Sequence, residues 1–306
     1  HKFGMRVPEG GSGSLTQALA RFVQDNGGEI RLNSWVKKFK IEKGVCKGVI
    51  LESGEEILGS KAVVTNFSIK QLDEKMLGAE NCPEHYLARL RGVRFQQYQS
   101  LLQGLALEEA PHYKAGADVS NAFGVEFAPD NMLEFNKEFD AYSYGETWTS
   151  TPLAACHTLW DKTRAPEGKH TMYLYHYEPY NLRGGAARWD EIREQVSDEI
   201  LNGICARTEN LTRDKVIGRW ISSPLDNERR NPAWIEGNFN QIGSYLFQQF
   251  GNRPFPGPVA GFRLPAEKFY LCGPSTYPGP GVIGGGRAAV QTVMEDLGID
   301  FDDVIG

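Results

Sequence analysis

The residues with the clearest potential for chemistry are glycines and prolines near the end of the sequence. A short apolar run, residues 269–272, stops at Gly273 and predicts a buried strand. Residues 274–281 are rich in proline and glycine, which form turns and leave the backbone bare. A helical pattern follows over residues 282–298. The unpaired N–H groups of its first turn, at the positive end of the helix dipole, suit an anion or the polar edge of a ring.

Residues 279–284, GPGVIG, match the dinucleotide-binding pattern G-x-G-x-x-G. In a true fingerprint the first glycine lies in the turn that ends the strand, and an acidic residue follows about 20 residues later. Here the first glycine lies well past the predicted strand, and 22 residues follow Gly284. The alternative is a glycine-rich loop that packs the last helix on a sheet, and the local pattern supports it at least equally.

The composition of the 306 residues excludes several classes of protein. With 41% apolar and 24% charged residues the chain is typical of soluble globular proteins. A net charge of −6 without a basic cluster predicts no nucleic-acid partner. Five scattered cysteines without C-x-x-C spacing predict neither a disulfide framework nor a metal site, and they fit a reducing, cytoplasmic location. We find no signal peptide and no apolar run that could span a membrane.

The first 66 residues predict one helix followed by short strands. Ser14 and Gln17 form a capping-box pattern at the start of a run with helical spacing that ends at residues 26–28. Two-residue turns, Lys43-Gly44 and Ser53-Gly54, separate strand-like runs. The strands are expected at residues 29–32, 36–41, 45–51 and 55–58, with a further apolar run at 62–64.

The middle of the chain predicts a second unit in which strands alternate with helices. Strand patterns cover residues 123–127, 171–177 and 216–221, and helix patterns cover 83–92 and 189–204. The alternation indicates a domain on an antiparallel or mixed sheet.

Some polar and aromatic residues in this unit have a functional and a plain interpretation. His157 and His176 are candidate bases, but a lone histidine is more often packed or on the surface. The tyrosines at 173, 175 and 177 share one strand face and suit an apolar substrate, although half-buried sheet faces are routinely aromatic. Residues 227–231, NERRN, are most simply a solvated loop. We favour the plain interpretation for each.

Five stretches, in order, resemble one family. They are PEGGSGSLTQAL, GGEIRLNSWVKKFKIEKGVCKGVILESGEEILGSKAVVTN, TLWDKTRAPEGKH, SPLDNERRNPAWIEGNF and LCGPSTYPGPGVIGGGRAA. They resemble the phytoene desaturase-like FAD oxidoreductases, a group with carotenoid desaturases, amine oxidase relatives and the pyridine nucleotide-disulphide oxidoreductase domain-containing protein 2 type. The resemblance covers most of the chain and is strongest at the last stretch.

The resemblance implies an α/β (α+β) fold. Residues 1–66 and 262–306 would be the C-terminal parts of an FAD-binding domain of the glutathione-reductase/amine-oxidase type. Residues 67–261 would be an inserted substrate-binding domain on a mixed or antiparallel sheet.

The resemblance also implies site residues. Val36 would meet the adenine end of FAD through its backbone, although a plain core valine is the alternative. Tyr277 is a candidate for facing the substrate, and its alternative role is packing on the flavin. The other residues implied to contact the cofactor are Asn66, Gly273, Pro278, Gly281, Val282 and Ile283.

The implied activity is a desaturase- or dehydrogenase-like oxidation. Hydride would pass from an apolar or cyclic organic substrate to flavin N5, and the helix N-terminus at Val282 and Ile283 would stabilise the charge left near N1 and O2. Because the flavin carries the redox step, the lack of an evident acid–base residue counts little against activity. One alternative is a non-catalytic subunit or fragment that completes an FAD site. Another is an amine-oxidase-type flavoenzyme with a cationic substrate.

One expected part of the family pattern is not found. Members begin with a βαβ unit that carries G-x-G-x-x-G and a ribose-binding acid, and nothing in residues 1–60 supplies it. We therefore expect a partner, an N-terminal Rossmann-type half from the same gene or a separate subunit, with FAD at the interface. Without it we expect no activity. The origin of the shorter chain, whether truncation, cleavage or a split enzyme, stays open, as do the substrate, the electron acceptor and homo-oligomerisation.

Overall fold

The chain forms two compact units in a computed structural model that describes residues 6–255, 261–281 and 284–305. Unit 1 comprises His1–Leu32 and Gln97–Asp226, and unit 2 comprises Asn33–Gln96 and Asn227–Gly306. Each unit has its own hydrophobic core. Among the described residues, no helix combines the length and apolar character needed to cross a membrane.

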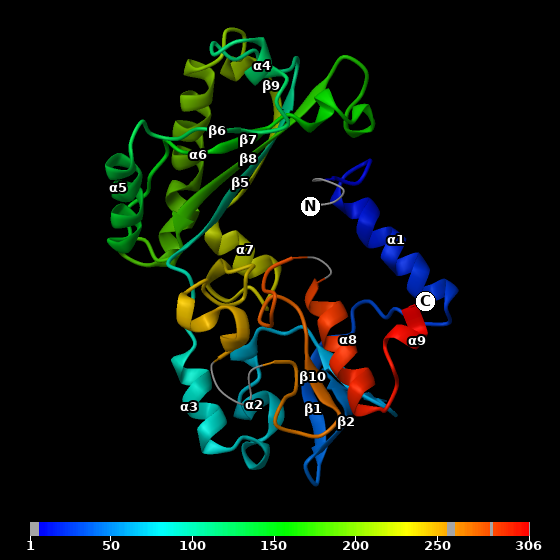
Figure 1. Ribbon diagram of the computed structural model, residues 1–306. Coiled ribbons are helices and arrows are strands. Elements are labelled where there is room, and N and C mark those ends of the chain that lie inside the picture. Colours follow the sequence, from blue (N-terminus) through cyan, green and yellow to red (C-terminus); the bar gives the residue numbers. More distant parts are fainter. Residues whose placement is uncertain (1–5, 256–260, 282–283, 306) are drawn as a thin grey trace. The chain divides into compact units, whose positions relative to one another are not determined.

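Unit 1 is built on a five-stranded antiparallel sheet with the strand order β6-β7-β8-β5-β9 (Figure 1). Its strands are β5 Tyr98–Leu107, β6 Val125–Glu126, β7 Leu153–Ala155, β8 His170–Pro179 and β9 Val216–Ser222. Its helices are α1 Ser12–Asp25, α4 Ala117–Ser120, α5 Met132–Ser143 and α6 Trp189–Ala206, and α7 Pro224–Arg230 begins in this unit.

Alternation along the two long strands decides which face of this sheet is buried. Leu101 and Leu105 of β5 pack with Leu174 of β8 against the apolar side of α6. On β8 the intervening tyrosines at 173, 175 and 177 lie on the opposite, less buried face, and two of them meet edge to face with ring centroids 5.2 Å apart. The predicted strand with its tyrosine face is confirmed.

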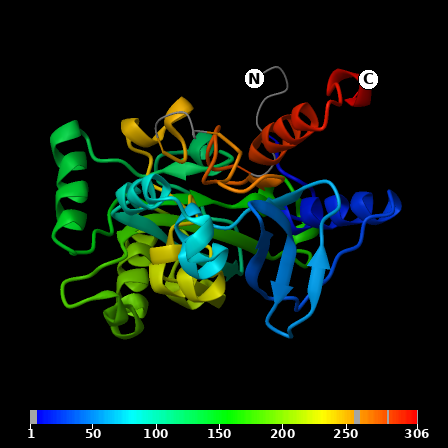
Figure 2. The ribbon, with the colours of Figure 1, turned by 90° about the horizontal axis from the view of Figure 1, so that it is seen from below.

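Unit 2 combines an antiparallel meander with a short parallel pair. The meander, in blue in Figure 2, consists of β1 Val36–Glu42, β2 Val45–Leu51 and β3 Glu56–Leu58. The parallel pair is β4 Val63–Thr65 with β10 Phe269–Leu271. The helices are α2 Glu74–Leu77, α3 Glu84–Gly92, α8 Gly284–Asp296, which packs against β10, and α9 Asp302–Ile305; short 3-10 turns include Ile69–Gln71, Leu246–Gln248 and Phe250–Asn252.

The meander, α3, α6, β9 and β10 confirm the predicted elements, but three local predictions are wrong. Residues 29–32 pair with no strand of the described chain, and Leu32 is exposed. The capping box is wrong because α1 begins at Ser12, after Gly11, which has no side chain to cap the helix. Residues 227–231 are no solvated loop, since α7 runs to Arg230 and Asn227 is buried.

The compact units divide the chain elsewhere than at the predicted boundaries, 66/67 and 261/262. Residues 67–96 belong to the core of unit 2, where Ile69, Leu72 and Tyr86 are buried with Phe39 and Phe269. Apolar side chains from both sides of the predicted boundary therefore share one core. The division into an FAD-binding and a substrate-binding domain concerns function and stays a prediction.

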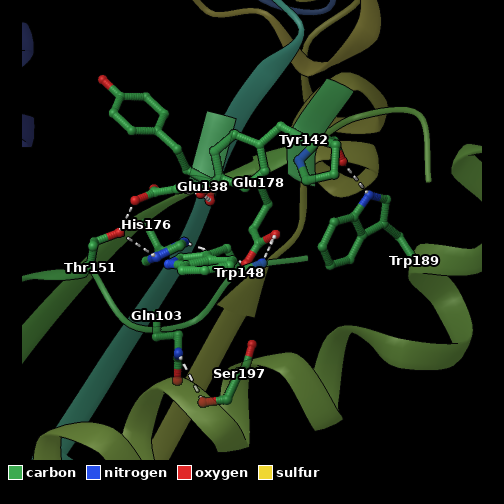
Figure 3. A network of polar contacts seen from close by, with 11 residues as sticks. Gln103, Glu138, Tyr142, Trp148, Thr151, His176, Glu178, Trp189 and Ser197 are labelled. Carbon is green, nitrogen blue, oxygen red and sulfur yellow. Dashed lines mark hydrogen bonds and ion pairs between the residues drawn. The ribbon is translucent and has the colours of Figure 1, made fainter. Parts of the chain in front are cut away.

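A network of buried polar side chains joins β8 to α5 in unit 1 (Figure 3). The Tyr142 hydroxyl lies 2.6 Å from Glu138 Oε1. The Thr151 hydroxyl donates to Glu138 Oε2 at 2.5 Å and lies 3.3 Å from His176 Nε2. His176 Nδ1 in turn faces Glu178 Oε1 at 3.4 Å. The chain of contacts thus ends on a histidine and a carboxyl group that face each other.

Burial decides the charge of this last pair, because His176 is 2% and Glu178 is 0% exposed. Burial lowers the pKa of the His176 imidazole to about 4, and it raises the pKa of the Glu178 carboxyl well above its usual range. Two neutral side chains therefore face each other at neutral pH, and the Trp148 N–H donates to Glu178 Oε2 at 3.3 Å. His176 is a packed core residue, as its plain interpretation has it.

We expect Glu178→Gln to raise the free energy of unfolding at about pH 8 by roughly 1 kcal/mol. The folded-state pKa of Glu178 lies above the unfolded value, so its contribution to stability is fully present below the unfolded pKa. That contribution is lost as the pH rises through the folded pKa. Glutamine keeps the acceptor for Trp148 and cannot ionise. In urea unfolding, the difference in the free energy of unfolding between the variant and the wild type should therefore grow from about pH 5 to about pH 8.

Glu146→Gln is the matched control in the same unit, because the Glu146 side chain is 56% exposed. It should leave the pH profile unchanged. Parallel profiles for the wild type and Glu178→Gln would contradict a protonated Glu178 in the folded chain.

Candidate cofactor-binding site

The carboxyl ends of the parallel strands β4 and β10 meet at one edge of unit 2. The Cys272 N–H donates to the Thr65 carbonyl at 2.7 Å, so the residues that follow the two strands are neighbours. A Cβ added to Gly273 would lie 3.3 Å from the Cβ of Asn66. In open α/β sheets, ligands bind outside the carboxyl ends of the strands. This edge is therefore a candidate ligand site.

One glutamine side chain ties the two strand ends together. Gln241 Nε2 donates to the Asn66 carbonyl at 2.8 Å. Its Oε1 accepts from the Ser275 N–H at 3.0 Å and from the Ser275 hydroxyl at 2.7 Å. The Ser275 Oγ also accepts from the Ile69 N–H at 3.1 Å. Because Gln241 and Ser275 are buried, these bonds fix the backbone behind the edge.

Three glycines leave the backbone at this edge bare. Gly273 has φ of 83°, a conformation that favours glycine. A Cβ on Gly285 would lie 3.0 Å from the Gly273 carbonyl oxygen, so α8 begins directly against the end of β10. Gly281 has φ of 150°, and nothing lies within 4 Å of the position of a Cβ there. Residues 284–286, the first turn of α8, carry no side chains.

A cavity of about 530 Å³ opens beside Asn66 and lies entirely within unit 2. Its size is in the range of small-molecule sites. Its lining includes three aromatic side chains, those of Trp35, Phe67 and Trp234, and also Val36 and Pro274. The cavity thus reaches from the start of β1 to the residue after Gly273.

The indole of Trp234 is placed by a tight turn. The Asn231 Oδ1 accepts from the Ala233 N–H at 3.0 Å, and the Asn231 carbonyl accepts from the Trp234 N–H at 2.8 Å. Gln71 Nε2 donates to the Pro232 carbonyl at 3.1 Å and attaches the turn to the segment after β4. The wall that Trp234 forms is therefore held by backbone contacts on both sides.

The structure brings part of the predicted site residues together. Val36 and Asn66 line the cavity, and Gly273 lies beside Asn66. Pro278 covers the start of α8, since a Cβ on Gly284 would lie 3.0 Å from its ring. Tyr277 is 50% exposed and does not line the cavity. Val282 and Ile283 lie outside the described residues, and the assigned role of every residue stays a prediction.

Sequence reasoning missed the residues that build the wall and the support of the cavity. Trp35 and Trp234 line it, and Gln241 and Asn231 hold its backbone. The N-P-A-W stretch at residues 231–234 is a turn signal with an aromatic residue after it, and it could have pointed to Trp234. Gln241 carries no local signal, because its partners lie far away in the sequence.

The candidate histidines lie in the other unit and are not part of this cavity. Burial lowers the pKa of His157, whose ring centroid lies 5.1 Å from that of Phe123. The structure places His176 in the buried network of unit 1. In the part of the chain that the structure describes, no three His, Cys, Asp or Glu residues are grouped to hold a metal ion.

The edge and its cavity fit the flavin dinucleotide that the family resemblance implies. A Cβ at Gly285 would fill the space that lets α8 approach Gly273, and Gly281 is open to close approach. The N–H groups in the first turn of a helix such as α8 have no partner within the helix and lie at the positive end of its dipole, which suits an anionic group. The aromatic wall suits a flat ring system.

Comparison with known proteins finds relatives in the group that the sequence resembles. No family model matches the sequence. The rat pyridine nucleotide-disulfide oxidoreductase domain-containing protein 2 is 28% identical over 301 residues, covering 94% of this chain and 51% of the rat protein. The 4,4'-diapophytoene desaturase (4,4'-diapolycopene-forming) of Methylomonas sp is 24% identical over 315 residues, covering 99% of this chain and 57% of the desaturase. The chain spans about half the length of the curated relatives it matches.

A solved structure shows the same fold. The crystal structure of an oxidoreductase from Methanosarcina mazei matches with a TM-score of 0.59 at 17% sequence identity, over 94% of this chain and 55% of that one. This likeness confirms the predicted α/β (α+β) fold class. In sequence the chain is similar to members of the phytoene desaturase-like oxidoreductases, the group that includes the pyridine nucleotide-disulfide oxidoreductase domain-containing protein 2 type.

Proposed function

We propose that the chain is part of an FAD-dependent oxidoreductase of the desaturase or dehydrogenase type. In this proposal, hydride passes from an apolar or cyclic organic substrate to flavin N5. The observation that carries it is the bare backbone at the carboxyl ends of β4 and β10, where α8 begins against Gly273. The similarity to a diapophytoene desaturase supports the reaction class.

The residues of this chain would bind and orient the cofactor, and FAD, when bound, supplies the redox chemistry. Gly273, Pro278 and Gly281, with Val282 and Ile283, are assigned to the flavin end. Val36 and Asn66 are assigned to the nucleotide side of the site. The N-terminus of α8 stabilises negative charge by about 0.3–1 kcal/mol when exposed and by more when buried. The aromatic wall excludes water, and Tyr277 remains the candidate for facing the substrate.

Unit 1 offers a surface that suits an apolar substrate. A cavity of about 790 Å³ lies against its sheet. Gly104 is paired with Tyr173 on one side and with Trp220 on the other, and all three line the cavity. Because Gly104 has no side chain, it leaves a shallow space between the rings of Tyr173 and Trp220. This part of the cavity suits a flat or extended hydrocarbon, whereas His157, Arg164 and Arg219 line other parts of it.

The alternative function, a subunit that completes an FAD site with a second polypeptide, is favoured by the edge of β4. The Val63 N–H donates to the Lys268 carbonyl, and the Thr65 carbonyl accepts from the Cys272 N–H. Because successive peptide groups of a strand point to opposite edges, those of Val64 point away from β10. Parallel sheets are normally larger and buried, whereas this one has two strands within the described residues, and Val64 is 44% exposed.

This open edge suits a further parallel strand. We propose that the N-terminal Rossmann-type half supplies that strand, together with the residues that bind the pyrophosphate of FAD. The proposal agrees with relatives that are about twice as long as this chain.

The purified chain alone is expected to lose FAD during gel filtration, and co-expression with the Rossmann-type half is expected to restore flavin absorbance. Val64→Pro should prevent this restoration, because proline removes an edge N–H and cannot pair there. Val64→Thr keeps the N–H and is the matched control. Stoichiometric, tightly held FAD on the chain alone would contradict the need for a second half.

Two neighbouring glycines test the close approach of α8. Gly285→Ala is expected to lower the free energy of unfolding by roughly 1–3 kcal/mol and to weaken FAD binding, because its Cβ would press on the Gly273 carbonyl. At Gly286 a Cβ meets nothing within 4 Å. Gly286→Ala should therefore be neutral or stabilise by up to about 1 kcal/mol. Urea unfolding and flavin fluorescence measure both, and equal effects would refute the close packing.

Trp220→Ala is expected to weaken binding of an uncharged apolar fluorescent probe such as Nile red to unit 1, because it removes one wall of the cavity. Trp160→Ala is the matched control, since Trp160 is 63% exposed and does not line the cavity. Probe titration measures the difference. If both variants bind the probe as the wild type does, the substrate surface lies elsewhere.

A further inference from the structure

An arginine is buried beneath the loop that follows β10. Arg253 is 1% exposed. Its Nε donates to the Pro274 carbonyl at 2.8 Å, and its Nη2 donates to the Asn240 carbonyl at 3.0 Å. Longer contacts join Nη1 to the Gln248 carbonyl at 3.4 Å and Nη2 to the Ile242 carbonyl at 3.5 Å. Every one of these partners is a backbone carbonyl.

The guanidinium lies close to both ends of the loop of residues 274–281. It binds the carbonyl of Pro274 at the start of the loop, and a Cβ on Gly279 near its end would lie 3.6 Å from the Arg253 Nε. The planar guanidinium donates hydrogen bonds to several carbonyls at once in a fixed geometry. The single ammonium group of a lysine cannot do this. The loop between the two ends therefore lies against one rigid group.

The segment around Gln248, against which Arg253 packs, is itself held by hydrogen bonds. The buried Gln248 donates through Nε2 to the carbonyls of Arg94 and Gly243, each at 3.0 Å. Its Oε1 accepts from the Arg94 N–H at 2.7 Å. The arginine is thus held from behind as well as from the loop side.

The charge of Arg253 is unbalanced within the described chain. Burial lowers the pKa of the guanidinium to about 10, so the side chain stays cationic at neutral pH. No carboxylate among residues 6–255, 261–281 and 284–305 forms an ion pair with it. Burying an unpaired cation is unfavourable, and an anionic group bound at the loop would offset part of that cost.

We infer that Arg253 is a positioning residue for the loop of residues 274–281, which follows β10 at the proposed cofactor site. It draws the Pro274 carbonyl inward, holds residues 274–281 beside the start of α8, and adds positive charge beneath a site for an anionic dinucleotide. The inference rests on the proposed FAD site, and it concerns how that site is kept ready in the absence of the cofactor.

The first test needs no cofactor and uses the whole 306-residue chain. In Arg253→Met, amide hydrogen exchange at residues 273–281 is expected to be at least about tenfold faster than in the wild type, because the loop opens locally. Arg253→Lys should show an intermediate rate, since lysine keeps the charge and can serve one carbonyl. The core strands of unit 1 should exchange at the wild-type rate.

Arg263→Met is the matched control. Arg263 lies in the same unit, its side chain is 54% exposed, and it pairs with Asp296 instead of with carbonyls of the loop. It should leave the exchange of residues 273–281 unchanged. Wild-type exchange of the loop in Arg253→Met would overturn the inference. So would faster exchange spread evenly over unit 2, which would indicate only a general part in folding.

The second test uses FAD as the probe, added to the chain assembled with its Rossmann-type half. Arg253→Met is expected to raise the dissociation constant by about tenfold, and Arg253→Lys should recover part of the affinity through its charge. Equal affinity of the wild type and Arg253→Met would overturn the positioning role even if the loop became mobile. If the wild-type assembly bound no FAD, the proposed function would fail, whereas the exchange result would still decide the role of Arg253 in the loop.

Discussion

The parallel pairing of β4 with β10 is the contact on which the candidate site depends. Each strand has only three residues, and the two come from opposite ends of the chain. Their pairing is stabilised from one side by the core of unit 2, where the ring centroids of Phe39 and Phe269 lie 4.5 Å apart. Because the strands run in the same direction, the residues after both strands fall at one edge, and Asn66 becomes a neighbour of Gly273.

The support of this edge and its open surface are made by different kinds of residue. Gln241 and Arg253 bind carbonyl and N–H groups on the inner side of the loops. The outer side is formed by glycines, which carry no side chain to cover the backbone. A site of this kind recognises its ligand through backbone and shape. It fits a protein in which the cofactor performs the redox step and no acid–base side chain has to be placed beside it.

The sequence predicted those elements whose signals are local. The end motif, the meander and α6 are bounded by turn residues or follow a clear helical period, and the structure has them near their expected bounds. The strand β5, which lies between β8 and β9, was not predicted, because Gln99, Ser100 and Gln103 are polar but buried and obscure its alternation. Gln103 is accommodated because its Nε2 donates to the Ser197 carbonyl of α6 (Figure 3).

The support of the site could not be predicted for a related reason. Gln241 and Arg253 act on residues that only the fold brings near, and neither lies in a recognisable motif. The glycines of the last loop were found because their number and spacing are unusual wherever they lie. Sequence therefore indicates where the backbone is bare, whereas the structure shows what holds it in place.

A density map of the FAD-loaded assembly tests the central claim most directly. We predict flavin density against the backbone of residues 273–281 and the first turn of α8, with the rest of the dinucleotide passing Asn66 and Val36. FAD bound elsewhere in the assembly would contradict the account. So would a loop packed shut against protein that leaves no room for the ring.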